Sequence, residues 1–314
     1  MLIRQLGYRL LISIPVLLCV IALGFVLMMM IPSDPAAIIA GDHATPAALE
    51  EIRESLGLNK PMWVQFLLYI ERLLQGDMGK SFLNSSDVFS ELSRSMEPTA
   101  ELVIVALLIA IPLGIGMGAA AAWSRGGFID RLVMALAALG MSAPVFMTGL
   151  LLISVVGVHL GWLPVQGRGG PVYTWDGLSH IILPAITVSF IVIGPIARIT
   201  RTSMLAIINE DFVRTARAKG IGERRVMIAH VLRNALIPTV NVIGLQAGYL
   251  LGGVVVTENI FAWPGIGRLA IISITTRDVP MAQGTILFLA ISFVMLNIVV
   301  DLIGGYLDPR AQRL

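Results

Sequence analysis

Three consecutive residues, Gly79-Lys80-Ser81, have the order that ends a phosphate-binding loop. In that motif backbone amides and the lysine hold the phosphates of a nucleotide, and a first glycine stands five residues before the second. The corresponding position in this chain is Leu74, so the first glycine is missing. The sequence therefore predicts no nucleotide site here, and if ATP drives this protein, another subunit must bind it.

Side chains suited to catalysis or metal binding are scattered along the chain. An intramembrane protease needs a serine with a histidine, or paired aspartates, deep in the membrane. His159 and His180 fall near the outer ends of predicted helices, His43 lies outside them, and Asp301 stands alone near the inner surface. The only cysteine, Cys19, lies in an apolar run and is expected to be a small hydrophobe. We therefore predict no catalytic residue and no metal site.

Three uncharged polar side chains, Asn241, Gln246 and Asn297, interrupt long apolar stretches. Such residues either line the path of a polar solute or form hydrogen bonds between helices, and the residue types favour neither alternative. Gly114 and Gly118 are four residues apart in another apolar stretch, which predicts a small-residue face for close helix packing.

The most informative polar segment is the basic stretch Asp211–Pro238, DFVRTARAKGIGERRVMIAHVLRNALIP. Asn209 can cap a helix that has acidic residues in its first turn, where the helix dipole favours them. Lys219 would lie in the last turn, and Gly220 can adopt the left-handed conformation that ends a helix. A second helix is expected from about Glu223.

Phe212, Thr215, Ala216 and Lys219 recur at helical spacing in the first of these helices. A small apolar face flanked by bases suits docking into a groove on a cytoplasmic partner protein. The alternative is an amphipathic helix that lies on anionic lipid. The residues expected to form the docking element are Asp211, Phe212, Arg214, Thr215, Ala216, Arg217, Lys219 and Gly220.

A second loop of interest runs from Glu258 to Arg268 and contains Trp263-Pro264-Gly265, which is typical of a tight turn. Its tryptophan is expected either to anchor the loop among lipid headgroups or to belong to an outer gate. The functional alternative to the gate is a contact for an external binding protein. The residues assigned to this gate or contact are Glu258, Asn259, Phe261, Trp263, Pro264 and Gly265.

The composition shows what must position these residues. Of the 314 residues 56% are hydrophobic and only 13% are charged, and the mean hydropathy is +0.85. Soluble domains carry about 25% charged residues, so this chain needs lipid as its solvent. The net charge of +2 is too small to suggest a nucleic-acid partner. Six uncharged intervals are long enough to cross a bilayer: Leu10–Ser33, Leu102–Ser124, Leu132–Gly167, Gly177–Ala197, Asn234–Thr257 and Val279–Val300.

The orientation follows from the arginines and lysines in the short loops. With the N-terminus inside, the inner loops hold most of them, eight between Arg198 and Arg233 alone, and the short outer loops hold only Arg168, Arg268 and Arg277. Both termini are therefore expected in the cytoplasm. The long outer segment should contain two helices, one opened by Thr45-Pro46 and closed by Gly57, and one running from Pro61 to Gln75.

The segment 211–238 resembles the coupling loop of ABC importer permeases, which combines an alanine-containing turn with a glycine and a following helix. Here the turn is Arg214-Thr215-Ala216 and the glycine is Gly220. The general signature begins with glutamate, and the arginine variant is similar to that of dipeptide, oligopeptide and nickel permeases. LGLNKPMWVQF (56–66), GDMGKSF (76–82), ENIFAWPGIGR (258–268) and LDPR (307–310) also resemble the first permease subunit of that subfamily.

The resemblance implies an all-α integral membrane protein with six transmembrane helices, the type I importer fold and a small helical periplasmic subdomain. It implies an N-terminal helix (1–33), the periplasmic subdomain (34–98), a five-helix core (99–305) with the coupling loop at 204–233, and a cytoplasmic tail (306–314). It also implies a second permease subunit, two ATPases that bind ATP and Mg²⁺, a solute-binding protein, and a place in the bacterial inner membrane.

The function implied is import of dipeptides or oligopeptides by alternating access, with no enzymatic activity in this chain. Nickel complexes, glutathione and other small solutes stay open as alternatives. A different class, the ion-coupled secondary transporter, should show ionisable residues at mid-membrane. None is visible at that depth, since His159 and His180 fall near helix ends, and such a transporter has no need of a docking loop.

Overall fold

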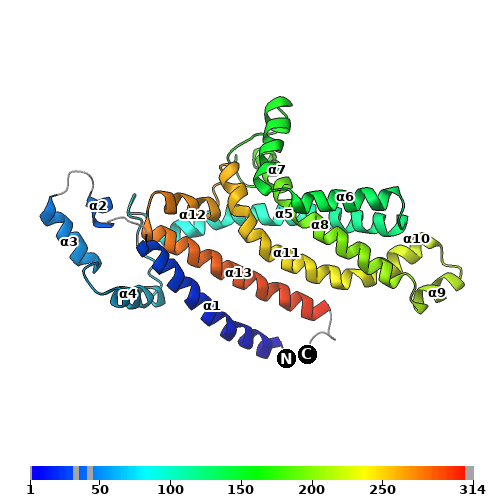
Figure 1. Ribbon diagram of the computed structural model, residues 1–314, viewed down its shortest axis with the longest axis horizontal. Coiled ribbons are helices and arrows are strands. Elements are labelled where there is room, and N and C mark those ends of the chain that lie inside the picture. Colours follow the sequence, from blue (N-terminus) through cyan, green and yellow to red (C-terminus); the bar gives the residue numbers. More distant parts are fainter. Residues whose placement is uncertain (1, 31–34, 41–44, 308–314) are drawn as a thin grey trace. The chain divides into compact units, whose positions relative to one another are not determined.

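The structure is a computed structural model that describes residues 2–30, 35–40 and 45–307. Predictions that concern His43 or the tail from residue 308 fall outside this part of the chain. The described regular elements are all helical (Figure 1): α1 (Leu2–Met30), α2 (Pro35–Ala40), α3 (Pro46–Leu56), α4 (Met62–Leu74), α5 (Val88–Ser124), α6 (Phe128–Ser142), α7 (Val145–Leu152), the π-helix η1 (Ile153–His159), α8 (Trp175–Ile207), α9 (Asp211–Ala218), α10 (Glu223–Arg225), the π-helix η2 (Val226–Leu232), α11 (Arg233–Ile260), α12 (Ile266–Thr275) and α13 (Val279–Leu307).

Five helical stretches among the described residues are long and apolar enough to cross a membrane. They are Leu11–Met30, Val88–Ser124, Trp175–Ile207, Glu223–Leu250 and Val279–Val300. The third predicted span takes another form, because α6 and the continuous pair α7–η1 meet at an angle of 104°. Counting this bent pair as one span gives the six that the sequence predicts, in an all-α integral membrane fold.

Proline affects these helices unequally. The bend between α6 and α7 falls at Ala143-Pro144, where Pro144 is the residue before the first turn of α7. Pro184 and Pro195 lie inside α8, and Pro238 lies inside α11, without ending either helix. A proline removes one helical hydrogen bond, and neighbouring helices in a membrane bundle can satisfy the freed group. The short apolar helix α12 was not predicted from the sequence.

The chain divides into two compact units, and each is described by itself. The first comprises Met1–Thr99 with Pro264–Val294, and the second comprises Ala100–Trp263 with Met295–Leu314. The boundaries differ from those of the four-part division expected from the sequence, which stays a prediction.

In the first unit, α3 has the caps that the sequence predicts, and α4 runs over Met62–Leu74 with no side-chain cap at its start. The Thr45 hydroxyl accepts a hydrogen bond from the Ala48 amide at 3.3 Å, and Gly57 ends α3 with φ +69°. Elsewhere in the unit, the buried Asp278 carboxylate accepts hydrogen bonds from the Ser81 hydroxyl and, at 3.1 Å, from the Phe82 amide. These bonds hold the segment before α5 against the start of α13.

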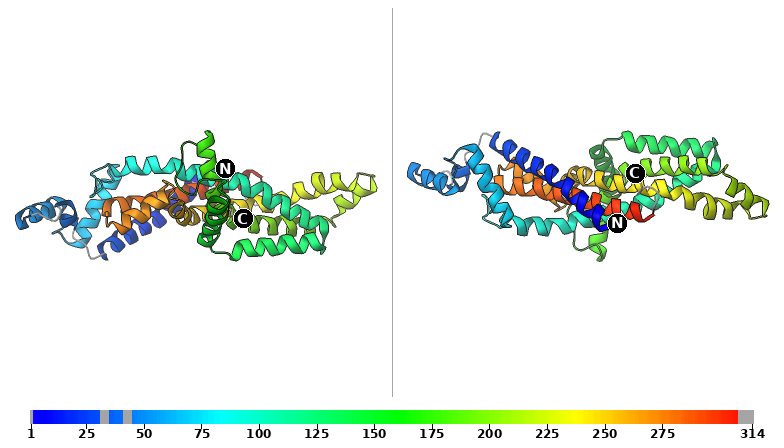
Figure 2. Two further views of the ribbon diagram at one scale, coloured as in Figure 1. Left: turned by 90° about the horizontal axis from the view of Figure 1, so that it is seen from above. Right: turned by 90° about the horizontal axis from the view of Figure 1, so that it is seen from below.

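In the second unit, α8 packs against both α6 and α11 (Figure 2). A buried cluster joins α5, α8 and α11 through residues such as Leu102, Val192 and Leu250. The close packing predicted for Gly114 and Gly118 is confirmed. A Cβ atom at Gly118 would lie 2.5 Å from the Ala197 carbonyl oxygen, so only glycine permits this approach of α5 to α8.

Candidate functional site

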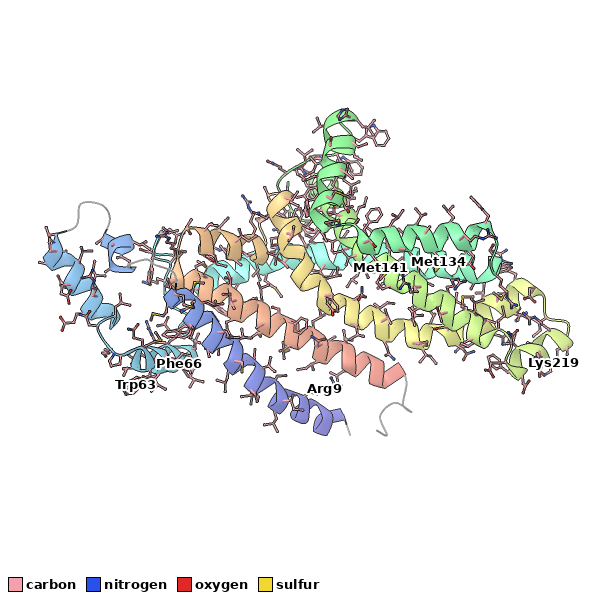
Figure 3. The ribbon with its side chains drawn as sticks, viewed as in Figure 1. Arg9, Trp63, Phe66, Met134, Met141 and Lys219 are labelled. Atoms are coloured by element: carbon pink, nitrogen blue, oxygen red, sulfur yellow. The ribbon has the colours of Figure 1, made fainter. Side chains whose placement is uncertain are left out.

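The predicted docking element is the short helix α9, which follows directly after the end of α8. Three residues separate Ile207 from Asp211, and α10 follows after Ala218 with only a short turn between them. Figure 3 labels Lys219, the residue that ends α9, at the far end of the second unit. The helix is thus attached at both ends to the membrane-embedded helices α8 and α11.

The ends of α9 partly follow the sequence prediction. The predicted cap at Asn209 is wrong, because Glu210 is the N-cap residue and no side chain caps the helix. The Glu210 carbonyl accepts hydrogen bonds from the Val213 and Arg214 amides instead. The predicted stop is confirmed, since Gly220 has φ +75° and its amide donates to the Arg217 carbonyl at 2.9 Å.

One face of α9 is buried in the protein. Val213 and Ala216 belong to a cluster that includes Ala122 of α5, Met204 of α8, and residues of η2 and α11. The expectation that Ala216 lies on the outward docking face is therefore wrong. Helical spacing alone could not reveal this, because the small Ala216 borders both faces and only the surrounding packing decides between them.

The opposite face of α9 is exposed. Phe212 keeps 45% of its surface accessible, and Asp211, Arg214, Thr215 and Lys219 are exposed as well. The Thr215 hydroxyl donates to the Asp211 carbonyl within the helix at 2.9 Å. Phe212, Thr215 and Lys219 follow one another three and four residues apart, so they form one outward stripe. An exposed aromatic ring beside a base can dock into a complementary groove.

Arg217 does not belong to the outward stripe. Its Nε donates to Glu223 Oε2 at 3.0 Å, and its Nη2 donates to Glu223 Oε1 at 2.8 Å. Its Nη1 donates to the Ile208 carbonyl at 3.3 Å. The hydrogen bond to Glu223 raises the pKa of Arg217 above its usual value, so the charge is fixed. Arg217 thus joins α9 to α10 and to the end of α8, and the sequence analysis missed Glu223 as its partner.

A cavity of about 280 Å³ lies beside this ion pair. It is lined by Arg217 and Glu223 themselves, by Ile208 and Met227, and by Trp123 and Arg125 from the end of α5. A tryptophan and an arginine next to a short exposed helix can accept a side chain from a docked protein. The sequence prediction did not include either residue.

A second ion pair fixes the same end of this unit. Arg201 of α8 contacts the buried Asp130 of α6 with two nitrogen atoms, and its Nη2 donates to Asp130 Oδ2 at 2.7 Å. The same carboxylate oxygen accepts a hydrogen bond from the Gly126 amide at 2.8 Å. The pair therefore ties the turn between α5 and α6 to α8. The sequence offered only one signal for it, an aspartate at the start of an apolar helix.

The loop that begins at Glu258 is packed more tightly than the sequence suggested. Trp263 is only 1% exposed and lies in the cluster with Leu102 and Leu250, so its expected role as a headgroup anchor is wrong. Glu258 and Phe261 are also buried, and the Gly167 amide donates to the Phe261 carbonyl at 2.9 Å. Of the six residues assigned to a gate, the two exposed ones are Asn259 and Pro264.

The polar residues predicted to line a path lie on two helices. Asn241 is exposed and Gln246 half-buried on α11, and Asn297 is half-buried on α13. Because exposed positions of a membrane helix can face lipid, a partner subunit or a path, both alternatives for these residues stay open.

Metal-binding side chains do not converge within the described part of the chain. No group of three or more histidine, cysteine, aspartate or glutamate residues there could hold a metal ion. The His159 ring contacts the Ser154 carbonyl at 2.9 Å, and the His180 ring contacts the Asp176 carbonyl at 2.8 Å. Both histidines are thus engaged within their own segments.

Comparison with known proteins gives two family matches that together cover almost the whole chain. The family described as "Binding-protein-dependent transport system inner membrane component" matches residues 99–313, and its N-terminal companion family matches residues 2–104. Among curated relatives, the dipeptide transport system permease protein DppB of Alkalihalophilus pseudofirmus is 41% identical over 97% of this chain and 98% of its own. The glutathione transport system permease proteins GsiC of Salmonella typhimurium and Escherichia coli K12 are each 42% identical over 97% of both chains.

Proposed function

The chain belongs to the family of binding-protein-dependent transport system inner membrane components, and from this premise we propose that it conducts short peptides as a permease subunit of an ATP-driven importer. As an ABC importer permease it is a multi-pass membrane protein and a transport component, not an enzyme. The family description itself implies a separate binding protein and a partner that supplies energy. The solute, the stoichiometry and the residue roles are the parts that we propose.

The names of the relatives support short peptides as the solute. One relative is a dipeptide permease and others are glutathione permeases, at nearly equal identity and coverage. Dipeptides and glutathione, which is a modified tripeptide, share a compact backbone with charged ends. Nickel complexes and other small solutes remain the alternatives. An ion-coupled mechanism is not favoured, because the family that matches residues 99–313 is described as part of a binding-protein-dependent transport system.

The two faces of α9 are the observation that carries the proposed coupling. The buried face, with Val213 and Ala216, is fixed to α8 and α11, while Phe212, Thr215 and Lys219 stay free to contact another protein. A partner that moves the outward stripe must therefore move the ends of two membrane helices. We assign the outward stripe to the contact with an ATPase, which holds ATP and Mg²⁺, while Arg217 and Gly220 keep α9 in place.

For the loop that begins at Glu258, we propose that Asn259 and Pro264 meet the solute-binding protein, because they are the exposed ones among the residues assigned to the gate. The buried Phe261 and Trp263 then support the loop without touching a partner. The proposed partner set is a second homologous permease, two ATPases and one binding protein. We also propose that both termini lie in the cytoplasm of a bacterial cell. For the domains of the chain we propose the N-terminal helix 1–33, the periplasmic subdomain 34–98, the core 99–305 and the tail 306–314.

The solute is tested by uptake into liposomes that contain the complete complex, with its binding protein outside and ATP inside. A dipeptide and glutathione are compared with a nickel chelate, each labelled, at equal concentration. We expect saturable uptake of at least one peptide and none of the chelate. A complex whose ATPases cannot hydrolyse ATP is the control and should show no uptake. Uptake of the chelate alone would contradict the peptide assignment.

A further inference from the structure

Helix α4 has an exposed apolar stripe that the transport function does not explain. Trp63 is 68% exposed, Leu67 55% and Leu74 84%, and Ile70 lies between the last two at helical spacing. The four positions follow one another at intervals of four, three and four residues, so they share one side of the helix. A short helix with a tryptophan and leucines along one side is typical of a helix that lies in a membrane interface.

The other side of α4 is attached to the end of a membrane span. Phe66 meets Phe25 of α1 edge to face with ring centroids 5.3 Å apart, and Tyr69 stacks on the same ring at 6.1 Å; Figure 3 labels Trp63 and Phe66. Phe25 lies five residues before Met30, the last residue of α1. At 1.5 Å per residue this is only about 7–8 Å along the helix, so α4 lies close to the boundary of the bilayer.

A cavity of about 680 Å³ opens next to this contact. Its apolar wall includes Phe25, Met28 and Leu68. Its volume falls in the range of about 300–1,000 Å³ that is usual for small-molecule sites. Because α1 supplies part of the wall, the cavity continues the surface that α1 offers to acyl chains.

The charged residues in the lining of this cavity are mainly basic. Arg53, Arg72 and Lys80 contribute three positive charges and Asp77 one negative charge. Arg53 has a nearby partner in Glu50 at 3.2 Å, and the Asp77 carboxylate accepts a hydrogen bond from the Gly79 amide at 2.8 Å. Burial raises the pKa of Tyr69, which also lines the cavity, to about 12 against the opposing effect of Arg72. Its hydroxyl therefore stays protonated and can donate a hydrogen bond to an anion.

We propose that α4 lies in the membrane interface and that this cavity binds an anionic phospholipid from the leaflet that the accessory segment 35–87 faces. An acyl chain would lie against Phe25, Met28 and Leu68. The phosphate would meet Arg72 and Lys80. Two observations favour lipid over a protein: the cavity shares a wall with a membrane span, and basic residues stand next to apolar ones, as an anionic amphiphile requires.

Lipid retention tests the cavity. The complete complex is reconstituted in phosphatidylglycerol and phosphatidylcholine, extracted in mild detergent, and analysed for bound lipid by mass spectrometry. We expect enrichment of phosphatidylglycerol, a loss of roughly tenfold in Arg72→Gln with Lys80→Gln, and retention in Arg72→Lys. Arg94→Gln is the matched control, because Arg94 is an exposed base of the same unit outside the cavity lining.

Three results would overturn the proposal. One is equal retention of the two lipids by the unaltered complex. Another is a loss in the Arg94 control as large as that in the double variant. The third is displacement of the lipid by millimolar dipeptide, which would make the cavity a site for transported solute. Unchanged dipeptide uptake in the double variant would leave the proposed function intact.

Spin labels test the placement of α4. Single cysteines replace Trp63, Leu67 and, as a control, Gln75, the exposed residue that ends α4, each in the complex whose permease carries Cys19→Ala. We expect labels at 63 and 67 to collide with oxygen, which concentrates in lipid, and the label at 75 to collide with a water-soluble nickel reagent. Labels at 63 and 67 that are shielded from both reagents would show a protein partner on the stripe. Labels that all meet the nickel reagent would show a helix in water. Either result would refute the membrane placement.

Discussion

Gly220 has a backbone conformation that only glycine adopts easily. Crowding by neighbouring atoms is not the reason why glycine stands at this position. A Cβ atom at this position would meet nothing within 4 Å, but φ is +75°. Gly222, two residues later, is equally open and has φ −58°. Substitutions at the two glycines therefore separate the effect of backbone conformation from the effect of the space that is available for a side chain.

We predict that Gly220→Ser disturbs α9 while Gly222→Ser does not. A serine in the left-handed region costs about 1–2 kcal/mol, whereas serine is a favourable N-cap residue at position 222. The measurement is ATP hydrolysis of the complete complex, stimulated by loaded binding protein, at equal membrane levels. We expect reduced stimulation in the first variant only. Equal stimulation in both variants would mean that the position of α9 does not depend on this turn.

Predictions for single residues succeeded mostly where local chemistry decides, the cap predicted at Asn209 being the exception. Thr45, Gly57 and Gly220 were placed correctly because caps and left-handed stops depend on neighbours in sequence. Ala216 was placed wrongly, and of the two alternatives for Trp263 the headgroup anchor was wrong, because the burial of both residues depends on helices that are distant in the chain. The partnership of Asp130 with Arg201, 71 residues apart, was missed for the same reason.

Helix α9 has one face that packs against the rest of the protein and one face that is exposed. Its inner face is part of a hydrophobic cluster, and its outer face offers Phe212. A charge placed at Ala216 would thus disrupt the cluster itself and could not report on docking alone. Substitutions in the outward stripe are the suitable probes.

We predict that Phe212→Ala lowers ATP hydrolysis stimulated by the binding protein about tenfold, because interface energy concentrates in a few buried aromatic anchors. Phe128→Ala is the matched control, since Phe128 is an exposed phenylalanine at the start of α6 and outside the loop. Both variants should reach the membrane in normal amounts. Full stimulation in Phe212→Ala would instead favour the alternative in which α9 lies on lipid.

The helices themselves were predicted well where uncharged stretches are long. Such stretches identified α1, α5, α8, α11 and α13, because a bilayer requires about 20 apolar residues. The 104° bend between α6 and α7 was not predicted, since composition does not set an angle. Helix α12 was missed because ten residues are too few to register as a span.

At the scale of the whole molecule, orientation in the membrane rests on the distribution of basic residues. Ser85 precedes α5 and Ala218 ends α9, and both are exposed. We predict that a cysteine at Ser85 reacts with an impermeant maleimide in intact cells, in a Cys19→Ala background, and that a cysteine at Ala218 reacts only after permeabilisation. The reverse pattern would invert the assigned topology.

The length of helix α5 has a mechanical consequence. Its 37 residues span about 55 Å, whereas the hydrocarbon core measures about 30 Å. The excess falls at the beginning, where Glu91, Arg94, Glu97 and Glu101 cannot enter hydrocarbon. The last turns of this helix therefore lie in lipid, and its first turns extend into water. Because the helix is continuous, a lateral force on the first turns is transmitted as a bending moment to the turns that lie in lipid.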